Sequence, residues 1–306
     1  MRLAAAALLL GPLAAAPSCE SHFEERVEAG PGGRLELDLD FGEGLRPDSG
    51  SLEIVSRAAD EVRLVADASG WGSSGVAFRV TREGGTVRID GGVGGSLSWL
   101  FGGPRVRVRI AVPRDFSADV RSSSGPIRIE DLRGEVRART GDAAVEVATV
   151  EGPVRLRLAS GEVRVSEVVG DVDVRLEDGD VELRWVRGDA ELRTGSGGLE
   201  VAHLSGRLRA RTDSGGIELR EVEGPIEAKT ESGSILASFS GRPEGLLETR
   251  SGSLEVQIPA EAGARLDAAS ASGRVEIAPG LARPGDDVGA PLRLYTARGS
   301  VVVRAR

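Results

Sequence analysis

Chemically reactive side chains are scarce in this sequence. Its 306 residues include one cysteine, two histidines and one tyrosine, and aromatic residues make up 3% of the chain. A single cysteine excludes an intramolecular disulfide. The shortage of aromatic residues means that the core must be built from valine, leucine, isoleucine and alanine. The formal net charge of −9 argues against a general nucleic-acid-binding protein, because such proteins carry a basic footprint.

The sequence also lacks the pattern of a helical protein. No stretch has a sustained 3.6-residue apolar period, and 43 glycines and 14 prolines are too many for a helical fold. These glycines do not follow the triplet period of collagen, and a hydrophobic content of 40% is sufficient for a core. The chain is therefore predicted to be all-β.

The N-terminus resembles an export signal. Arg2 supplies a short positive start, and the apolar run from Leu3 to Ala16 is too short for a permanent membrane anchor. Ala16-Pro17-Ser18-Cys19 is similar to the lipobox of bacterial lipoproteins, with alanine where leucine is usual. We predict lipidation at Cys19, and ordinary signal cleavage after Ala16 or a neighbouring residue is the alternative.

An 18-residue repeat runs through the middle of the chain. One aliphatic column recurs at this spacing: Ile127, Val145, Val163, Val181, Leu199, Ile217 and Ile235. A glycine column recurs at the same spacing: Gly134, Gly152, Gly170, Gly188, Gly206 and Gly224. A repeat of this kind indicates that one small unit is stacked on copies of itself.

Each repeat is predicted to form two short strands joined by glycine-containing turns. Glycine lies at one turn in the Gly134 column and at the other in a column that begins at Gly125 and is broken once by Ala143. The inward candidates of the first repeat are Ile127, Ile129, Leu132, Val136, Ala138 and Thr140. A left-handed coil of hexapeptides would also contain 18 residues, but position 133 and its repeats are mostly charged where that coil needs apolar residues. The sequence therefore predicts a β-solenoid of flattened two-strand coils.

Shorter alternating segments precede the repeats and predict strands with one buried face. They are 35–39, 62–66, 76–80, 87–89 and 106–110. The rhythm loosens after Ile235, where we expect an atypical end. We divide the chain into a signal peptide (1–19), a tether (20–33), an N-terminal β region (34–121) and a β-solenoid with a C-terminal cap (122–306).

The segment 106–113 (VRVRIAVP), followed by Ser124-Gly125 and the Ile-x-Ile…Leu-x-Gly…Val-x-Ala repeat, resembles a large bacterial family of β-strand-repeat proteins. Members have no known function and are commonly labelled candidate adhesins. The resemblance covers roughly residues 34–306 and is most specific over 106–240. It implies an exported, right-handed β-solenoid at the cell envelope, and it brings no catalytic residues.

No catalytic, cofactor-binding or metal site is predicted. His22 lies in the expected tether, and we interpret His203 as a solvated turn residue, because convergent ligands are not evident around it. The turn column of His203 also contains Asp131, Thr149, Glu167, Trp185 and Glu221. The acidic cluster 177–180 (EDGD) lacks the spacing of a calcium loop, and we interpret it as an ordinary acidic turn.

One outward column is uniformly basic. It comprises Arg139, Arg157, Arg175, Arg193, Arg211 and Lys229. Like charges stacked about 4.8 Å apart repel one another, and the neighbouring acids Asp173, Glu191, Asp213 and Glu227 could neutralise them. The column is therefore either a neutralised, soluble strand surface or a groove for an anionic polymer such as an acidic glycan, lipopolysaccharide or nucleic acid.

A second candidate surface is the apolar trio Trp99, Leu100 and Phe101, which lies between glycine runs. We predict that these residues fold back to plug one end of the solenoid. The alternative is an exposed apolar tip for a membrane or a partner.

These patterns favour a non-enzymatic cell-envelope protein, held by lipid at Cys19, that displays a rigid β-solenoid for adhesion or scaffolding. The expected location is the outer membrane, the periplasm or the cell surface. Expected partners are an envelope glycan, lipopolysaccharide or a surface protein; nucleic acid and a small-molecule substrate are not expected. The alternatives are a carbohydrate-active β-helix enzyme, such as a polysaccharide lyase, and an envelope sensor or assembly partner.

Overall fold

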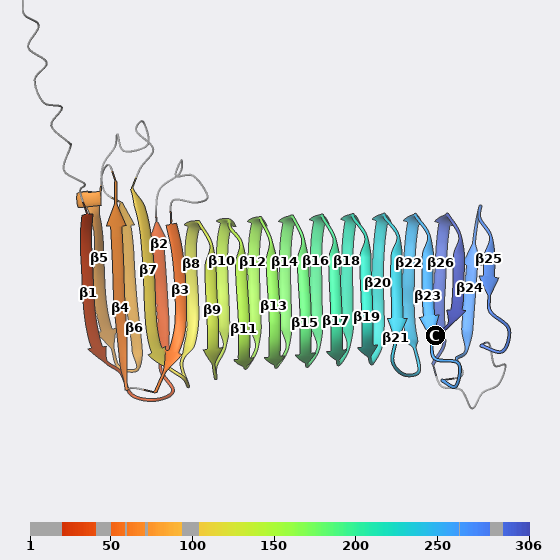
Figure 1. The fold of residues 1–306 in the computed structure, drawn as a ribbon, viewed down its shortest axis with the longest axis horizontal. Coiled ribbons are helices and arrows are strands. Elements are labelled where there is room, and N and C mark those ends of the chain that lie inside the picture. Colours follow the sequence, from red (N-terminus) through yellow and green to blue (C-terminus); the bar gives the residue numbers. More distant parts are fainter. Residues whose placement is uncertain are drawn as a thin grey trace, which may run out of the picture.

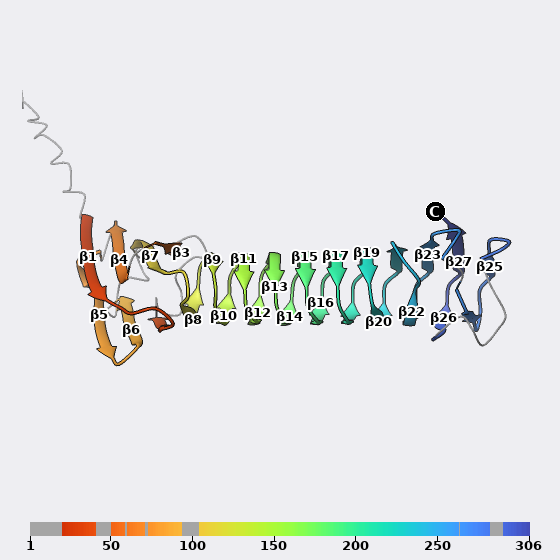
Figure 2. The same ribbon diagram turned by 90° about the horizontal axis from the view of Figure 1, so that it is seen from below.

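A computed structural model describes residues 20–40, 50–58, 60–70, 73–93, 104–262, 264–281 and 290–306. These residues form an elongated stack in which strands lie side by side along the long axis of the molecule (Figure 1). Viewed from below, the strands of the central region lie in two layers (Figure 2). The predicted lipidation site Cys19 and the apolar trio Trp99, Leu100 and Phe101 lie outside the described residues.

Two long sheets contain the strands of the described residues. In spatial order, sheet A comprises β1 (Glu20–Glu28), β4 (Glu61–Ser69), β7 (Arg105–Pro113), β3 (Gly50–Arg57), β9 (Ile127–Leu132), β11 (Val145–Glu151), β13 (Val163–Val169), β15 (Val181–Arg187), β17 (Leu199–Ser205), β19 (Ile217–Glu223), β21 (Ile235–Phe239), β23 (Leu254–Ile258), β27 (Val301–Ala305) and β25 (Val275–Ile277). Sheet B comprises β24 (Leu266–Ser270), β26 (Leu292–Arg298), β22 (Glu244–Ser251), β20 (Pro225–Ser232), β18 (Leu208–Ser214), β16 (Ala190–Ser196), β14 (Val172–Asp178), β12 (Val154–Ser160), β10 (Val136–Asp142), β8 (Ser117–Ser124), β2 (Arg34–Asp40), β6 (Thr86–Val93) and β5 (Val76–Glu83). A short 3₁₀ turn, η1 (Ser73–Gly75), precedes β5. No helix of the described residues is long and apolar enough to span a membrane.

The central coils confirm the predicted β-solenoid. From β8 to β23, each coil contributes one strand to sheet B and the next to sheet A, and neighbouring strands of a sheet run parallel. Val145 pairs with Ile127 on one side and with Val163 on the other, so that the 18-residue spacing is the height of one coil. The predicted inward residues of the first coil, from Ile127 to Thr140, are all buried between the two sheets.

The turn glycines are required because successive coils approach each other closely. Gly179 has a φ of +131°, and a Cβ at this position would overlap the carbonyl oxygen of Gly161 in the preceding coil. The same overlap would occur between Gly170 and the carbonyl of Gly152. Glycine is suited to these positions because it tolerates positive φ and leaves room for another backbone.

The column of His203 lies within the strands of sheet A, so its prediction as a turn column was wrong. Its members have left-handed backbone, with φ between 53° and 57°: Asp131, Thr149, Glu167, Trp185, His203 and Glu221. In β15 this residue makes two successive side chains, Arg184 and Trp185, face outward before Val186 returns to the core. The bend accounts for the uneven inward spacing of Ile127, Ile129 and Leu132.

The strand order departs from the sequence order at both ends of the stack. Coil β2–β3 lies between coil β6–β7 and coil β8–β9, and coil β26–β27 lies between β22–β23 and β24–β25. Parallel stacking therefore continues through the predicted boundary at residues 121 and 122, which falls inside β8. Antiparallel strands β1, β4 and β5 cover the N-terminal end.

The predicted tether is replaced in part by a strand. Residues 20–28 form β1, which pairs antiparallel with β4 at the edge of sheet A. His22 lies in this strand, and its Nδ1 is 2.7 Å from Oδ1 of Asp67. The hydrogen bond with His22, together with Arg109, holds the pKa of Asp67 below its usual value. The alternation of β1 was missed because its more buried side chains include the polar residues Ser21 and Glu25 beside the two apolar residues Phe23 and Val27.

Candidate functional site

The basic column forms a continuous ladder on the outer face of sheet B, and we call each residue of this ladder a rung. Arg139 pairs with Arg157, and the register continues through Arg175, Arg193 and Arg211 to Lys229. The structure adds one rung that the sequence analysis missed: Arg121 of β8 pairs with Arg139. Its signal was available, because Arg121 precedes Arg139 by one period. Acidic residues stand at both ends of the ladder. In the strand register, Asp38 is opposite Arg121 and Glu248 is opposite Lys229.

Three rungs toward the C-terminal end are neutralised by carboxylates. Nε of Arg175 lies 3.2 Å from Oδ1 of Asp173, and Nη2 of Arg193 lies 2.5 Å from Oε1 of Glu191. Lys229 is 3.1 Å from Glu227 and 3.6 Å from Glu248. These contacts are those expected of a neutralised strand surface. Asp213, by contrast, forms no ion pair with a described residue.

The rungs toward the N-terminal end have no such partners. Arg121, Arg139 and Arg157 are exposed and form no ion pair within the described part of the chain. For Arg139 and Arg157 the cause lies in the adjacent outward column, which places Arg137 and Arg155 where Arg175, Arg193 and Lys229 have acids. We call these five arginines the basic patch.

The basic patch contains one compensating glutamate. Glu135 lies 2.8 Å from Nη2 of Arg137 and also contacts Arg155. Asp119 lies two residues before Arg121 and does not pair with it, and its Oδ1 is buried without a hydrogen-bond partner among the described residues. The patch therefore retains excess positive charge. Outside the patch, the rung Arg211 also forms no ion pair among the described residues, whereas its neighbour Arg209 contacts Glu227.

The acidic cluster at 177–180 is part of the stack. Asp178 accepts a hydrogen bond of 2.5 Å from the hydroxyl of Ser196, and Asp180 accepts one of 2.7 Å from the backbone N–H of Gly198. Both contacts join one coil to the next. Among the described residues, no group of three or more histidine, cysteine, aspartate or glutamate side chains is arranged to hold a metal ion.

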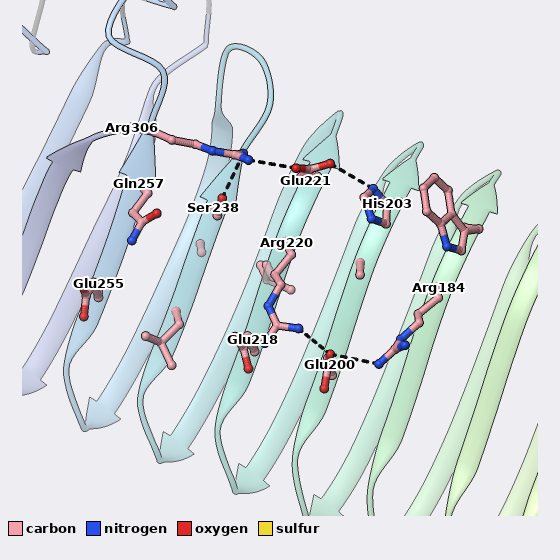
Figure 3. A pocket seen from close by; sticks show the side chains of 15 residues that line it. Arg184, Glu200, His203, Glu218, Arg220, Glu221, Ser238, Glu255, Gln257 and Arg306 are labelled. Carbon is pink, nitrogen blue, oxygen red and sulfur yellow. Dashed lines mark hydrogen bonds and ion pairs between the residues drawn. The ribbon is translucent and has the colours of Figure 1, made fainter.

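A hollow of about 510 Å³ lies on the outer face of sheet A, over β15 to β23. Two lines of linked side chains run across the strands here, as Figure 3 shows. The first line joins Trp185, His203, Glu221 and Arg306. The second joins Arg184, Glu200, Arg220 and Glu218. The sequence analysis missed this site, although a signal was available: Trp185 and His203 are 18 residues apart, which places them side by side on neighbouring strands of sheet A.

The first line begins with an aromatic stack. The rings of Trp185 and His203 are 3.7 Å apart and 8° from parallel. Nδ1 of His203 lies 3.0 Å from Oε2 of Glu221, and Nη2 of Arg306 donates a 2.9 Å hydrogen bond to Oε1 of the same carboxylate. The hydrogen bond from Arg306, together with His203, lowers the pKa of Glu221.

The second line is made of arginine–glutamate pairs. Oε1 of Glu200 accepts a 2.7 Å hydrogen bond from Nη1 of Arg220 and lies 3.6 Å from Nη2 of Arg184. Nη2 of Arg220 also donates a 2.5 Å hydrogen bond to Glu218. Small side chains, Ala202 and Ser238, lie in the same outward column as the two arginines, and leave the space between the lines open.

The stacked parallel coils define the class of the protein as a β-solenoid. Residues 169–283 match the family model described as Toastrack DUF4097, and this match confirms over that stretch the family resemblance found in the sequence. The matched stretch contains His203 and most of the hollow, whereas the basic patch lies before it. Comparison with curated proteins finds no significant match.

Two solved structures can be aligned with nearly the whole of this chain. One is a candidate cell adhesion protein of Clostridium sporogenes, with 11% identity and a TM-score of 0.26, covering 94% of this chain and 100% of the other. The second is a candidate adhesin of Bacteroides fragilis, with 10% identity and a TM-score of 0.30, covering 94% and 97%. At these TM-scores the likeness is loose, and the fold is established by the strands of this chain itself.

Proposed function

We propose that this chain is a non-enzymatic cell-envelope protein that displays a rigid β-solenoid for adhesion or scaffolding, and that its basic patch binds an anionic polymer. The observation that carries the proposal is the run of three successive rungs, Arg121, Arg139 and Arg157, without an ion pair among the described residues. The acidic rungs Asp38 and Glu248 limit the ladder at its two ends.

The spacing of the rungs supports a polymeric ligand. Neighbouring rungs are about 4.8 Å apart, and guanidinium groups form paired hydrogen bonds with carboxylates and phosphates. A polymer with one anion on each unit can contact several rungs in succession, whereas a small anion contacts one or two. Stacked like charges cost stability, and the later coils show that this column accepts neutralising acids two residues away.

The charge of the whole chain supports a confined site. A net charge of −9 means that the chain as a whole repels a polyanion. Binding should therefore depend on the patch and should weaken as salt screens it. The same chemistry occurs in an acidic glycan and in the phosphates of lipopolysaccharide, so both are used as probes.

A matched pair of triple variants tests the proposal. The patch variant is R121Q/R139Q/R157Q, and the control variant is R175Q/R193Q/K229Q, which removes equal charge from paired rungs of the same ladder. We expect the patch variant to bind polygalacturonate or lipopolysaccharide at least tenfold more weakly than the control, because each lost charged contact contributes on the order of 0.5–1 kcal/mol. Equal losses in the two variants, or no binding of either probe by the native chain, would contradict it.

A further inference from the structure

The hollow on sheet A has a chemistry different from that of the basic patch. It lies on the opposite outer face of the solenoid, because the two sheets pack with their inner faces together. Each of its three arginines, Arg184, Arg220 and Arg306, contacts a glutamate. The hollow is therefore close to electrically balanced, and it does not favour a polyanion.

Its size and wall suit a small polar ligand. A volume of about 510 Å³ falls in the range of small-molecule sites, roughly 300–1,000 Å³. Glu200, Glu218 and Gln257 offer oxygen acceptors, while the arginines and the amide of Gln257 offer donors. The ion pairs hold several of these groups in place, which reduces the ordering that a ligand would have to impose.

An exposed indole flanks this polar wall. Trp185 is 58% exposed, although aromatic residues make up 3% of the chain. It also has a φ of 56°, a conformation that a bulky residue adopts rarely. Neither the exposure nor the backbone favours tryptophan here on grounds of stability. Thr149 and Glu167, at the same position in the two preceding coils, show that smaller residues satisfy the fold.

We propose that the hollow binds a neutral pyranose unit of a glycan. One face of such a sugar is made of C–H groups that pack on an indole, and its hydroxyls both donate and accept hydrogen bonds. This combination matches Trp185 and the stacked His203 on one side and the glutamate–arginine pairs on the other. A charged polymer would meet groups of both signs, because three arginines and four glutamates line the hollow. An apolar ligand would cover these charged groups without forming hydrogen bonds to them.

Titration with neutral oligosaccharides tests this site. The probes are cello-, malto-, manno-, galacto- and chito-oligosaccharides, measured by calorimetry and by tryptophan fluorescence in a W71F/W99F background, which leaves Trp185 as the single tryptophan. We expect at least one probe to bind at up to millimolar concentration, to change the fluorescence, and to retain its affinity in high salt. Absence of binding by every probe would overturn the proposal.

Two variants in the same column localise the binding. Trp185→Thr should weaken it at least tenfold, because the equivalent Thr149 already holds this backbone conformation, whereas Glu167→Thr lies outside the hollow and should leave it unchanged. Equal binding by Trp185→Thr and the native chain would overturn the assignment. The R121Q/R139Q/R157Q variant should bind the sugar normally, so that failure of this site and failure of the polyanion site are separate results.

Discussion

At the scale of single residues, a column of buried threonines ties successive coils together. The hydroxyls of Thr194, Thr212 and Thr230 each donate to the carbonyl oxygen of a turn glycine in the preceding coil, at 3.0–3.1 Å. Thr140 occupies the same column near its start, but its hydroxyl is buried and has no hydrogen-bond partner in the part of the chain that the structure describes. A buried hydroxyl stabilises a fold only when its hydrogen bond is made.

Two matched substitutions follow from this difference. Thr212→Val should lower the free energy of unfolding by about 1 kcal/mol, because it removes the hydrogen bond to Gly197. Thr140→Val should leave the stability unchanged or raise it, because no bond is lost. Chemical denaturation of both variants measures the difference, and an equal loss in the two would contradict the assigned role of the column.

The carboxylate of Glu221 makes the stabilising contribution of the first line of the hollow, from Trp185 to Arg306, depend on pH. Its folded pKa is lowered by the hydrogen bond from Arg306 and by His203, so its stabilising contribution is present above the ordinary glutamate pKa and is lost as the pH falls through the lowered value. Arg306→Gln should therefore raise the pKa of Glu221 toward its ordinary value. Carboxyl NMR titration measures this shift, and an unchanged pKa in the variant would remove Arg306 as its main cause.

At the scale of elements, the columns on the two faces could be predicted from the sequence because the fixed period sets the register. The inward stripe and the ladder from Arg139 to Lys229 were both found in this way. The ion pairs were not resolved, because they depend on which acids in the columns on either side reach the ladder: Glu227 does, and Asp213 does not among the described residues. The hollow was missed for a similar reason, since it combines side chains from columns that look ordinary when each is considered alone.

The rungs Arg121, Arg139 and Arg157, which form no ion pair among the described residues, should lower the stability of the fold. R121Q/R139Q/R157Q is expected to raise the free energy of unfolding by about 0.5–1 kcal/mol at low ionic strength, because adjacent like charges in a sheet repel. The gain should shrink in high salt. The control R175Q/R193Q/K229Q should not be stabilised, because its charges are paired. Thermal unfolding at two salt concentrations checks this, and stabilisation of the control alone would show that the pairing has been assigned to the wrong rungs.

At the scale of the whole molecule, the repeat makes the fold nearly one-dimensional, because each coil contacts its neighbours along the stack. The sequence predicted this architecture for residues 122–306, with a regular repeat up to Ile235 and a C-terminal cap after it. It did not predict the insertion of β2–β3 and β26–β27 between other coils, because these segments depart from the period and nothing local specifies their neighbours. Pairing at the ends is set by long-range contacts.

Removal of a complete coil tests the one-dimensional account. Deletion of residues 163–180 removes β13 and β14 together and joins segments that keep the 18-residue register. We expect this variant to fold with reduced stability, as one coil and one interface are lost. Deletion of residues 163–171 removes β13 alone, joins two strands of sheet B, and should prevent folding. Circular dichroism and thermal unfolding distinguish the two, and similar behaviour of both deletions would contradict the account.

The central claim is that the unpaired arginines of sheet B form the binding surface for an anionic polymer. The salt dependence of polygalacturonate or lipopolysaccharide binding tests this claim most directly, because each ionic contact steepens the fall of affinity with salt. The account predicts a clearly shallower dependence for R121Q/R139Q/R157Q and an unchanged one for R175Q/R193Q/K229Q. The same slope in both variants, or a loss confined to the control, would contradict it.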